Sequence, residues 1–155
     1  MSVAETSAPI ALDVADGVAR LRLNRPEASN GMNVEFLRAL HEAALACHAD
    51  PAVRVVLLTG EGRNFCAGGD IHTFESKGAD LPDYLREATA WLQLATAALI
   101  QLRVPVVARC RALPRAAAGW DWCVHLTSSS QHDRQSSSRG RSESAWHPTA
   151  ARRSR

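Results

Sequence analysis

Residues Val53–Ile71 read VRVVLLTGEGRNFCAGGDI and join a strand pattern to a glycine motif. Val53–Thr59 is rich in β-branched residues and leucine and lies between a proline and a glycine, which predicts a strand buried on both faces. Gly60–Arg63 predicts a turn into Asn64–Ile71. Two glycines after a small residue permit close approach by a ligand and leave backbone N–H groups free to bind an acceptor.

Free backbone amides are the donors that an oxyanion hole needs. The local pattern leaves an alternative open, because Gly-Gly-Asp at Gly68–Asp70 is equally typical of a turn followed by a helix cap. The flanking sequence has to decide between these two interpretations.

Two alternating runs precede this stretch. Ile10, Leu12 and Val14 alternate with other residues, Asp16-Gly17 predicts a turn, and Leu21 and Leu23 then alternate with arginines. This pattern predicts a β-hairpin with one buried face.

Apolar periodicity predicts two helices around the strand. The first follows Asn33, a good N-cap, and ends at Asp50-Pro51; the second begins near Asp80 and ends before Pro105. A further buried strand is expected at Val104–Ala108, and the resulting order predicts an α/β layered domain. The apolar helix positions are Val34, Leu37, Leu40, Ala44 and Cys47, then Leu85, Ala88, Trp91, Leu92, Ala95, Leu99 and Leu102.

The composition fits one domain, with 155 residues of which 46% are hydrophobic. There is no apolar run long enough to span a membrane and no secretory signal in Met1–Pro9, so we expect a cytoplasmic protein that does not bind membranes. Four cysteines without C-x-x-C spacing predict reduced thiols. Six histidines without ligand spacing predict no metal site.

The chain divides into two compositions. Residues 1–109 carry ten Lys/Arg and thirteen Asp/Glu, whereas residues 110–155 carry eight Arg, three acidic residues and nine serines. The second part has too few large aliphatic side chains to offset the entropy of ordering it. We therefore expect a disordered N-terminus at 1–9, a folded domain at 10–109, and a disordered Ser/Arg-rich tail at 110–155.

Three segments together resemble the crotonase (enoyl-CoA hydratase/isomerase) family in order and spacing. They are FCAGGDI at Phe65–Ile71, the loop NRPEASNGMN at Asn24–Asn33, and VPVVA at Val104–Ala108. The resemblance covers about residues 10–109 and implies the N-terminal part of a crotonase-like ββα spiral fold. It also implies hydration or isomerisation of an acyl-CoA thioester, with two backbone N–H groups stabilising the enolate.

The resemblance implies particular site residues. The backbone N–H of Ala67 is expected to be the first oxyanion donor, and Gly68, Gly69, Asp70 and Ile71 are expected to line the same substrate pocket. The family needs no metal or redox cofactor, because coenzyme A is part of the substrate. Its members form homo-oligomers, which is doubtful for this chain.

The loop at Glu27 and Ala28 matches a family segment that lies along coenzyme A. These two residues complete the expected substrate-binding set.

The chain departs from the family after VPVVA. The family continues there with a glycine cluster that supplies the second oxyanion amide and with catalytic glutamates, whereas this chain reads CRALPRAAAG from Cys110. Back-translated and read two nucleotides out of phase, Arg111–Gln131 can encode the family's Gly-Phe-Ala-Ala-Gly-Gly-Gly-Gly-Leu-Gly segment and its continuation. We therefore hypothesise a frameshift near Arg109–Cys110, from a damaged gene or a sequencing error.

Three functional interpretations follow from these residues. The favoured one is an inactive, truncated form of an acyl-CoA hydratase or isomerase, because the second donor and the acid/base residues are absent from the matching positions. A second is a non-catalytic fragment that binds coenzyme A. The third, which the composition favours least, is a basic tail that binds nucleic acid or an anionic surface, with Trp120, Trp122 and Trp146 stacking on bases.

Overall fold

The computed structural model describes residues 8–110, so the expectations for 1–7 and for the tail at 111–155 lie outside the described residues. Strands β1 (Ile10–Ala15) and β2 (Val18–Leu23) form the expected hairpin. Its turn places Asp16 and Gly17 at φ 53° and 79°, the positive values that a two-residue hairpin turn requires.

The four strands lie in one sheet in the order β1-β2-β3-β4, which is also their order along the chain. β3 (Val55–Gly60) pairs in parallel with β2, and β4 (Val106–Arg109) pairs in parallel with β3. Among the four described strands only the hairpin pair is antiparallel, and each parallel pair needs a crossover connection, usually a helix.

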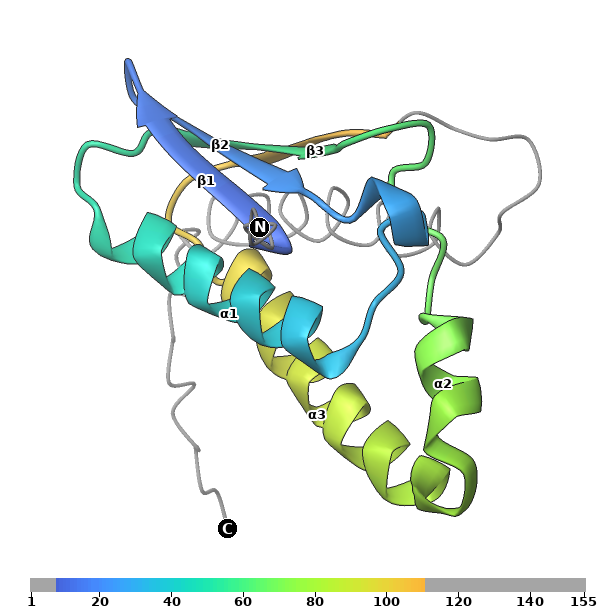
Figure 1. The fold of residues 1–155 in the computed structure, drawn as a ribbon. Helices are drawn as coiled ribbons and strands as arrows, with labels where there is room; N and C mark the ends of the chain where they lie inside the picture. Colours follow the sequence, from blue (N-terminus) through green and yellow to red (C-terminus); the bar gives the residue numbers. More distant parts are fainter. Residues whose placement is uncertain (1–7, 111–155) are drawn as a thin grey trace, which may run out of the picture.

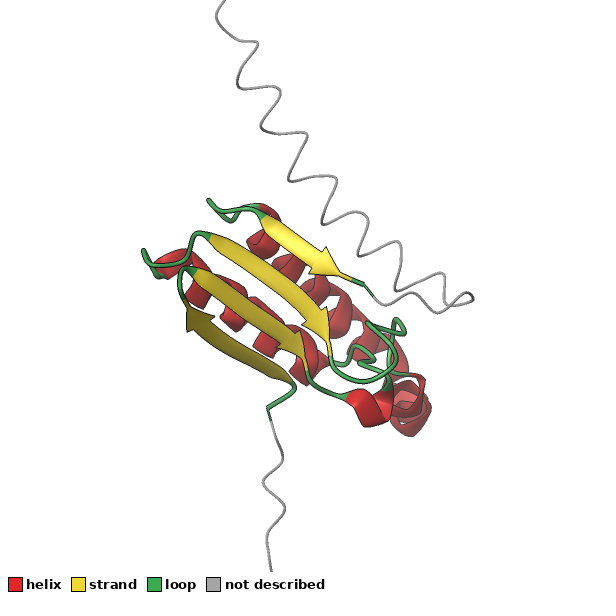
Figure 2. Ribbon diagram, turned by 90° about the horizontal axis from the view of Figure 1, so that it is seen from above, coloured by secondary structure: helices red, strands yellow, loops and turns green. Residues whose placement is uncertain are grey.

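Helices α1 (Val34–Ala49) and α3 (Leu81–Ile100) provide these crossovers and cover the same face of the sheet (Figures 1 and 2). α1 begins at Asn33 as expected, because the Asn33 side chain accepts a hydrogen bond from the Phe36 N–H at 2.8 Å. The α/β class is thereby confirmed.

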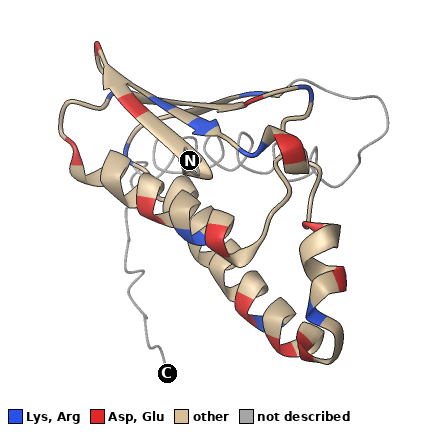
Figure 3. Ribbon diagram, viewed as in Figure 1, with Lys and Arg blue, Asp and Glu red and all other residues tan. Residues whose placement is uncertain are grey.

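The core lies between the sheet and these two helices. It includes Leu21 and Leu23 of β2, Val56 and Leu58 of β3, and Leu99 of α3, all at most 1% exposed. Both α1 and α3 carry charged residues of both signs (Figure 3), and Arg38 of α1 forms an ion pair with Glu87 of α3 at 3.7 Å.

Two burial predictions are wrong. Leu12 and Val14 are 36% and 39% exposed, because β1 is the edge strand and only its Ile10 end lies in the core. The strand at β3 is expected to be buried on both faces, but Val55 and Leu57 are only half-buried. The helices in the described part of the chain cover one face of the sheet, which leaves those side chains on the other face (Figure 2).

A short helix that the sequence analysis does not predict, α2 (Ile71–Lys77), follows the glycine motif. Asp70 is its N-cap, so the Gly-Gly-Asp stretch is a helix cap as well as a ligand candidate.

Between residues 8 and 110, no helix has the length and apolar character needed to cross a membrane. Cys47 and Cys66 are free thiols as expected, but Cys110 is disulfide-bonded and corrects the expectation of reduced thiols throughout.

Candidate functional site

Two loops leave the sheet side by side at the carboxyl ends of β2 and β3. Leu23, the last residue of β2, is paired with Gly60, the last residue of β3. The loop that follows β2 includes the short 3-10 helix Pro26–Ala28 and ends at α1, and the loop that follows β3 ends at α2. Ligand sites in parallel α/β sheets form at this edge, where loops from adjacent strands converge.

The two loops are joined by backbone hydrogen bonds at Met32. Met32 N–H donates to the Gly68 carbonyl at 2.8 Å, and the Asp70 N–H donates to the Met32 carbonyl at 3.0 Å. Together these bonds make a single parallel β-bridge between Met32 and Gly69. The glycine motif is therefore held to the preceding loop as a short extended strand.

The Ala67 N–H, expected to be the oxyanion donor, has a partner in this structure. It donates to the Ser29 carbonyl at 3.1 Å, so a ligand oxygen would have to displace that carbonyl. Ser29 and Asn30 have φ of 53° and 54°, in the left-handed region that costs a serine about 1 kcal/mol or more.

Gly69 differs from Ala67 in this respect. In a parallel bridge the central residue directs its own N–H away from the partner strand, so the Gly69 N–H points away from Met32. Within residues 8–110 it has no hydrogen-bond partner. Gly69 as a residue is also partly exposed.

The side of Gly69 that lacks a side chain faces Phe74 of α2. A Cβ atom built on Gly69 would approach Phe74 Cε2 to 2.5 Å, which is closer than real contacts allow. Phe74 in turn packs edge-on against Tyr84 of α3, with ring centroids 6.1 Å apart. A side chain at residue 69 would therefore have to displace the Phe74 ring from its present position against the loop.

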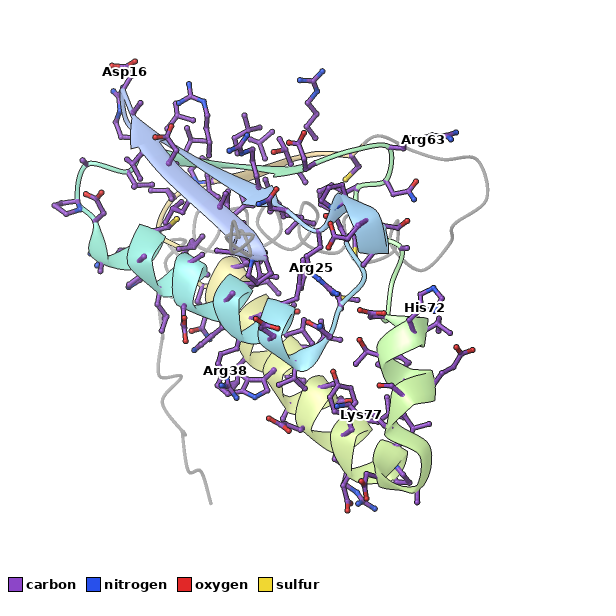
Figure 4. All side chains as sticks on the ribbon, in the orientation of Figure 1. Asp16, Arg25, Arg38, Arg63, His72 and Lys77 are labelled. Atoms are coloured by element: carbon purple, nitrogen blue, oxygen red, sulfur yellow. The ribbon has the colours of Figure 1, made fainter. Side chains whose placement is uncertain are left out.

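A largely buried ion pair between Arg25 and Asp70 links the loop after β2 to the start of α2. Arg25 donates to Asp70 Oδ2 at 2.9 Å and to the Gly31 carbonyl at 2.7 Å, with side chains 19% and 6% exposed for Arg25 and Asp70. Figure 4 shows the Arg25 side chain directed between its loop and the start of α2. Burial raises the pKa of Asp70, but hydrogen bonds from the Thr73 N–H and from Arg25 outweigh it and lower the pKa below its ordinary value.

Asn30 ties the same loops together from within. Its side chain is fully buried; its Oδ1 accepts from the Arg25 N–H at 2.8 Å and its Nδ2 donates to the carbonyls of Glu61 and Asn64 at 2.9 and 2.7 Å. A buried polar side chain with every hydrogen bond made rigidifies its surroundings. Neither Arg25 nor Asn30 is expected at the site from the sequence, because a polar residue in a polar loop gives no periodic or spacing signal.

Cys66 directly precedes Ala67 and the two glycines in the chain and is 5% exposed. Burial raises the pKa of its thiol, and the nearby Gly68 N–H lowers the pKa by a smaller amount. The thiol is therefore protonated near neutral pH, which fits a packing role and not a nucleophile.

An open pocket of about 500 Å³ lies at the two loops that follow β2 and β3. It is lined by Pro26, Ser29, Gly62, Arg63 and Asn64, so it adjoins the segment that carries Glu27 and Ala28. Figure 4 shows the Arg63 side chain extended away from the body of the protein.

Ile71 is 61% exposed on α2, and His72 beside it points outward. Among the residues that the structure describes, no three His, Cys, Asp or Glu side chains are grouped as they would be around a metal ion.

The fold and the site define an α/β protein that presents a backbone N–H donor at the carboxyl ends of parallel strands. The sequence model of the enoyl-CoA hydratase/isomerase family matches residues 18–110, and the chain belongs to this family.

The alignments with curated relatives cover only part of each relative's length. A probable enoyl-CoA hydratase of Mycobacterium leprae is 38% identical over 81 residues, which are 50% of this chain and 32% of the relative. A 1,2-epoxyphenylacetyl-CoA isomerase of Escherichia coli is 46% identical over 59 residues, 38% of this chain and 22% of the relative. The chain thus spans a third or less of these relatives.

The solved structure of an enoyl-CoA hydratase from Mycobacterium smegmatis gives a TM-score of 0.59 at 34% identity. The match covers 66% of this chain and 39% of that one. The described residues therefore have the crotonase-like α/β fold that the sequence predicts.

Proposed function

We propose that this chain binds an acyl-CoA thioester and that the Gly69 N–H donates to the thioester carbonyl oxygen. The observation that carries the proposal is that the N–H of Gly69, a partly exposed residue fixed in a β-bridge, has no hydrogen-bond partner in residues 8–110. Because the Ala67 N–H already donates to Ser29, the donor role passes from Ala67 to Gly69. A fixed donor of this kind contributes about 3 to 4 kcal/mol to transition-state stabilisation.

In this proposal Ala67, Gly68, Asp70 and Ile71 border the acyl end of the ligand. Glu27 and Ala28 lie along the coenzyme A portion. The open pocket beside them has a cationic side chain, Arg63, at its rim, which suits an anionic phosphate. Coenzyme A enters as part of the substrate, and the chemistry proposed for these residues uses no resident metal or redox cofactor.

The reaction proposed for the whole protein is hydration or isomerisation of the acyl-CoA through an oxyanion-stabilised enolate. The names of two relatives, a hydratase and an isomerase, support both. We propose a cytoplasmic location for the protein. Members of the family form homo-oligomers, and we propose that this chain does not.

For the chain as it stands we propose binding without turnover. Residues 110–119 read CRALPRAAAG where the family has its second donor loop, and one donor without an acid/base pair leaves the proton transfers uncatalysed. The frameshift hypothesis accounts for this departure. Reading the codons for residues 110–155 tests it, because DNA that does not encode the family segment in the other phase excludes a frameshift.

Calorimetry with the full 155-residue chain tests the binding proposal. The ligands are acetyl-CoA and S-ethyl-CoA, a thioether in which a methylene group replaces the carbonyl. We expect acetyl-CoA to bind about tenfold or more tightly, since only it offers an oxygen to the Gly69 N–H. Equal affinities would contradict the donor role, and no binding of either ligand would contradict the function as a whole.

A further inference from the structure

We infer that Arg25 and Asp70 are positioning residues for the Gly69 N–H, an inference that rests on the proposed function of that amide. Asp70 borders the acyl end of the ligand in that proposal and Arg25 is assigned no contact with it, so the role inferred for this pair acts through the Gly69 amide. Their effect is to fix the two strands of the bridge on either side of the donor.

The Arg25 guanidinium contacts both strands of the Met32–Gly69 bridge. One nitrogen donates to Gly31, the residue before Met32, and another pairs with Asp70, the residue after Gly69. A single rigid planar group thus holds both strands of the Met32–Gly69 bridge. A bridge of one residue pair has little stability by itself, so the guanidinium determines its geometry.

Burial carries the second step. Asp70 is 6% exposed and Arg25 19% exposed, so water competes weakly for their hydrogen bonds. Asp70 Oδ1 accepts from the Thr73 N–H at 3.2 Å while Oδ2 takes Arg25, so both carboxylate oxygens have partners. The carboxylate therefore links the donor loop to the first turn of α2.

Asn30 extends this link to the start of the second loop. It joins the Arg25 backbone to the carbonyls of Glu61 and Asn64, so the loop is held at both ends while Gly69 itself has no side chain to hold it. A donor acts on a carbonyl only when its position is held within about 0.5 Å. Loss of the ion pair should consequently affect carbonyl recognition more than binding of the rest of the ligand.

The substitution Asp70→Asn tests this inference. Asparagine is as good an N-cap as aspartate, so α2 keeps its cap while the ion pair loses its negative charge. The matched control is Asp13→Asn, which removes the exposed Arg20–Asp13 pair at 3.6 Å. A second variant, Arg25→Lys, keeps the charge but cannot bridge Gly31 and Asp70 as a planar fork does.

Two readouts are measured on the full chain. The first is the NMR order parameter of the Gly69 amide without ligand, and the second is the ratio of the affinities for acetyl-CoA and S-ethyl-CoA. We expect Asp70→Asn to lower the order parameter from about 0.85 to below about 0.6 and the affinity ratio about tenfold. Arg25→Lys should have a smaller effect in the same direction, and Asp13→Asn none.

An unchanged order parameter and ratio in a folded Asp70→Asn variant would overturn the inference. Equal changes in Asp13→Asn would overturn it too, since the effect would then reflect general stability. Should Asp70→Asn fail to fold, Arg25→Lys decides by the same criteria. If wild type shows no preference for acetyl-CoA, the proposed donor role of Gly69 fails, while the order parameter still decides whether the ion pair positions the amide.

Discussion

Asp70 connects two parts of the chain, because one carboxylate oxygen caps α2 and the other pairs with Arg25. Charged hydrogen bonds of this kind contribute about 1.5 to 3 kcal/mol when poorly exposed. Its neighbour Gly69 has no side chain, and the ring of Phe74 fills the space that a side chain would need. The candidate site thus depends on the paired carboxylate of Asp70 and on the absence of a side chain at the adjacent Gly69.

The pH dependence of stability should reveal the role of the Asp70 charge. The folded-state pKa is lowered, so the carboxylate stabilises the fold fully above its unfolded pKa of about 3.9 and loses this contribution as the pH falls through the folded value. The difference in free energy of unfolding between wild type and Asp70→Asn should therefore be constant near neutral pH and shrink below about pH 4. Urea unfolding at several pH values measures it; a difference that grew on acidification would contradict the lowered pKa.

Substitution of Gly69 by alanine should destabilise the protein by about 1 to 3 kcal/mol through overpacking. The new Cβ would meet the Phe74 ring at 2.5 Å, so the ring, which packs edge-on against Tyr84, would have to shift. Urea unfolding of Gly69→Ala, Phe74→Ala and the double variant forms a thermodynamic cycle. We expect the alanine at residue 69 to cost little once Phe74 is truncated; an undiminished cost would place its cause in the backbone.

The helices α1 and α3 are the elements that the sequence predicts best. Each presents several turns of apolar residues, and Asn33 marks the start of α1. Helix α2 is not predicted, because seven residues provide too few turns for a periodic signal and none of its side chains is buried. β3 and β4 each begin two residues later and end one residue later than expected, because pairing with neighbouring strands sets the ends of a strand and is not visible in the local sequence.

Removal of the α1 cap should cost about 1 kcal/mol. In Asn33→Ala the Phe36 N–H loses the side-chain acceptor at 2.8 Å, whereas Asn33→Asp retains an oxygen in the same place. Thermal unfolding followed by circular dichroism compares the two variants. An aspartate variant as unstable as the alanine variant would show that Asn33 acts by something other than capping.

The whole molecule has a sheet whose described helices all lie on one face (Figure 2). Sequence analysis predicts the layers, but it predicts burial of Leu12, Val14 and both faces of β3 too generously. Apolar alternation shows which side chains share a face of a strand, not whether anything covers that face. The candidate site is predicted to within a few residues because the glycine motif is local, whereas Arg25 and Asn30 act through contacts formed only in the folded chain.

Exposed apolar side chains on β4 should promote self-association. Val107 is 50% exposed and lies on the edge strand of the described sheet, where an added lysine opposes pairing with another chain. We expect Val107→Lys to reduce concentration-dependent light scattering without lowering the unfolding temperature. Leu45→Lys is the control, equally exposed but on α1, and an equal reduction there would indicate a general effect of charge.

The strand order of the sheet bears on how the protein is made. Each strand pairs with the strand that precedes it in the chain. During synthesis, the pairing partner of each new strand has therefore already left the ribosome. The hairpin can form first, and every later strand adds to one growing edge without threading or rearrangement. Synthesis and assembly therefore run in the same direction through Arg109.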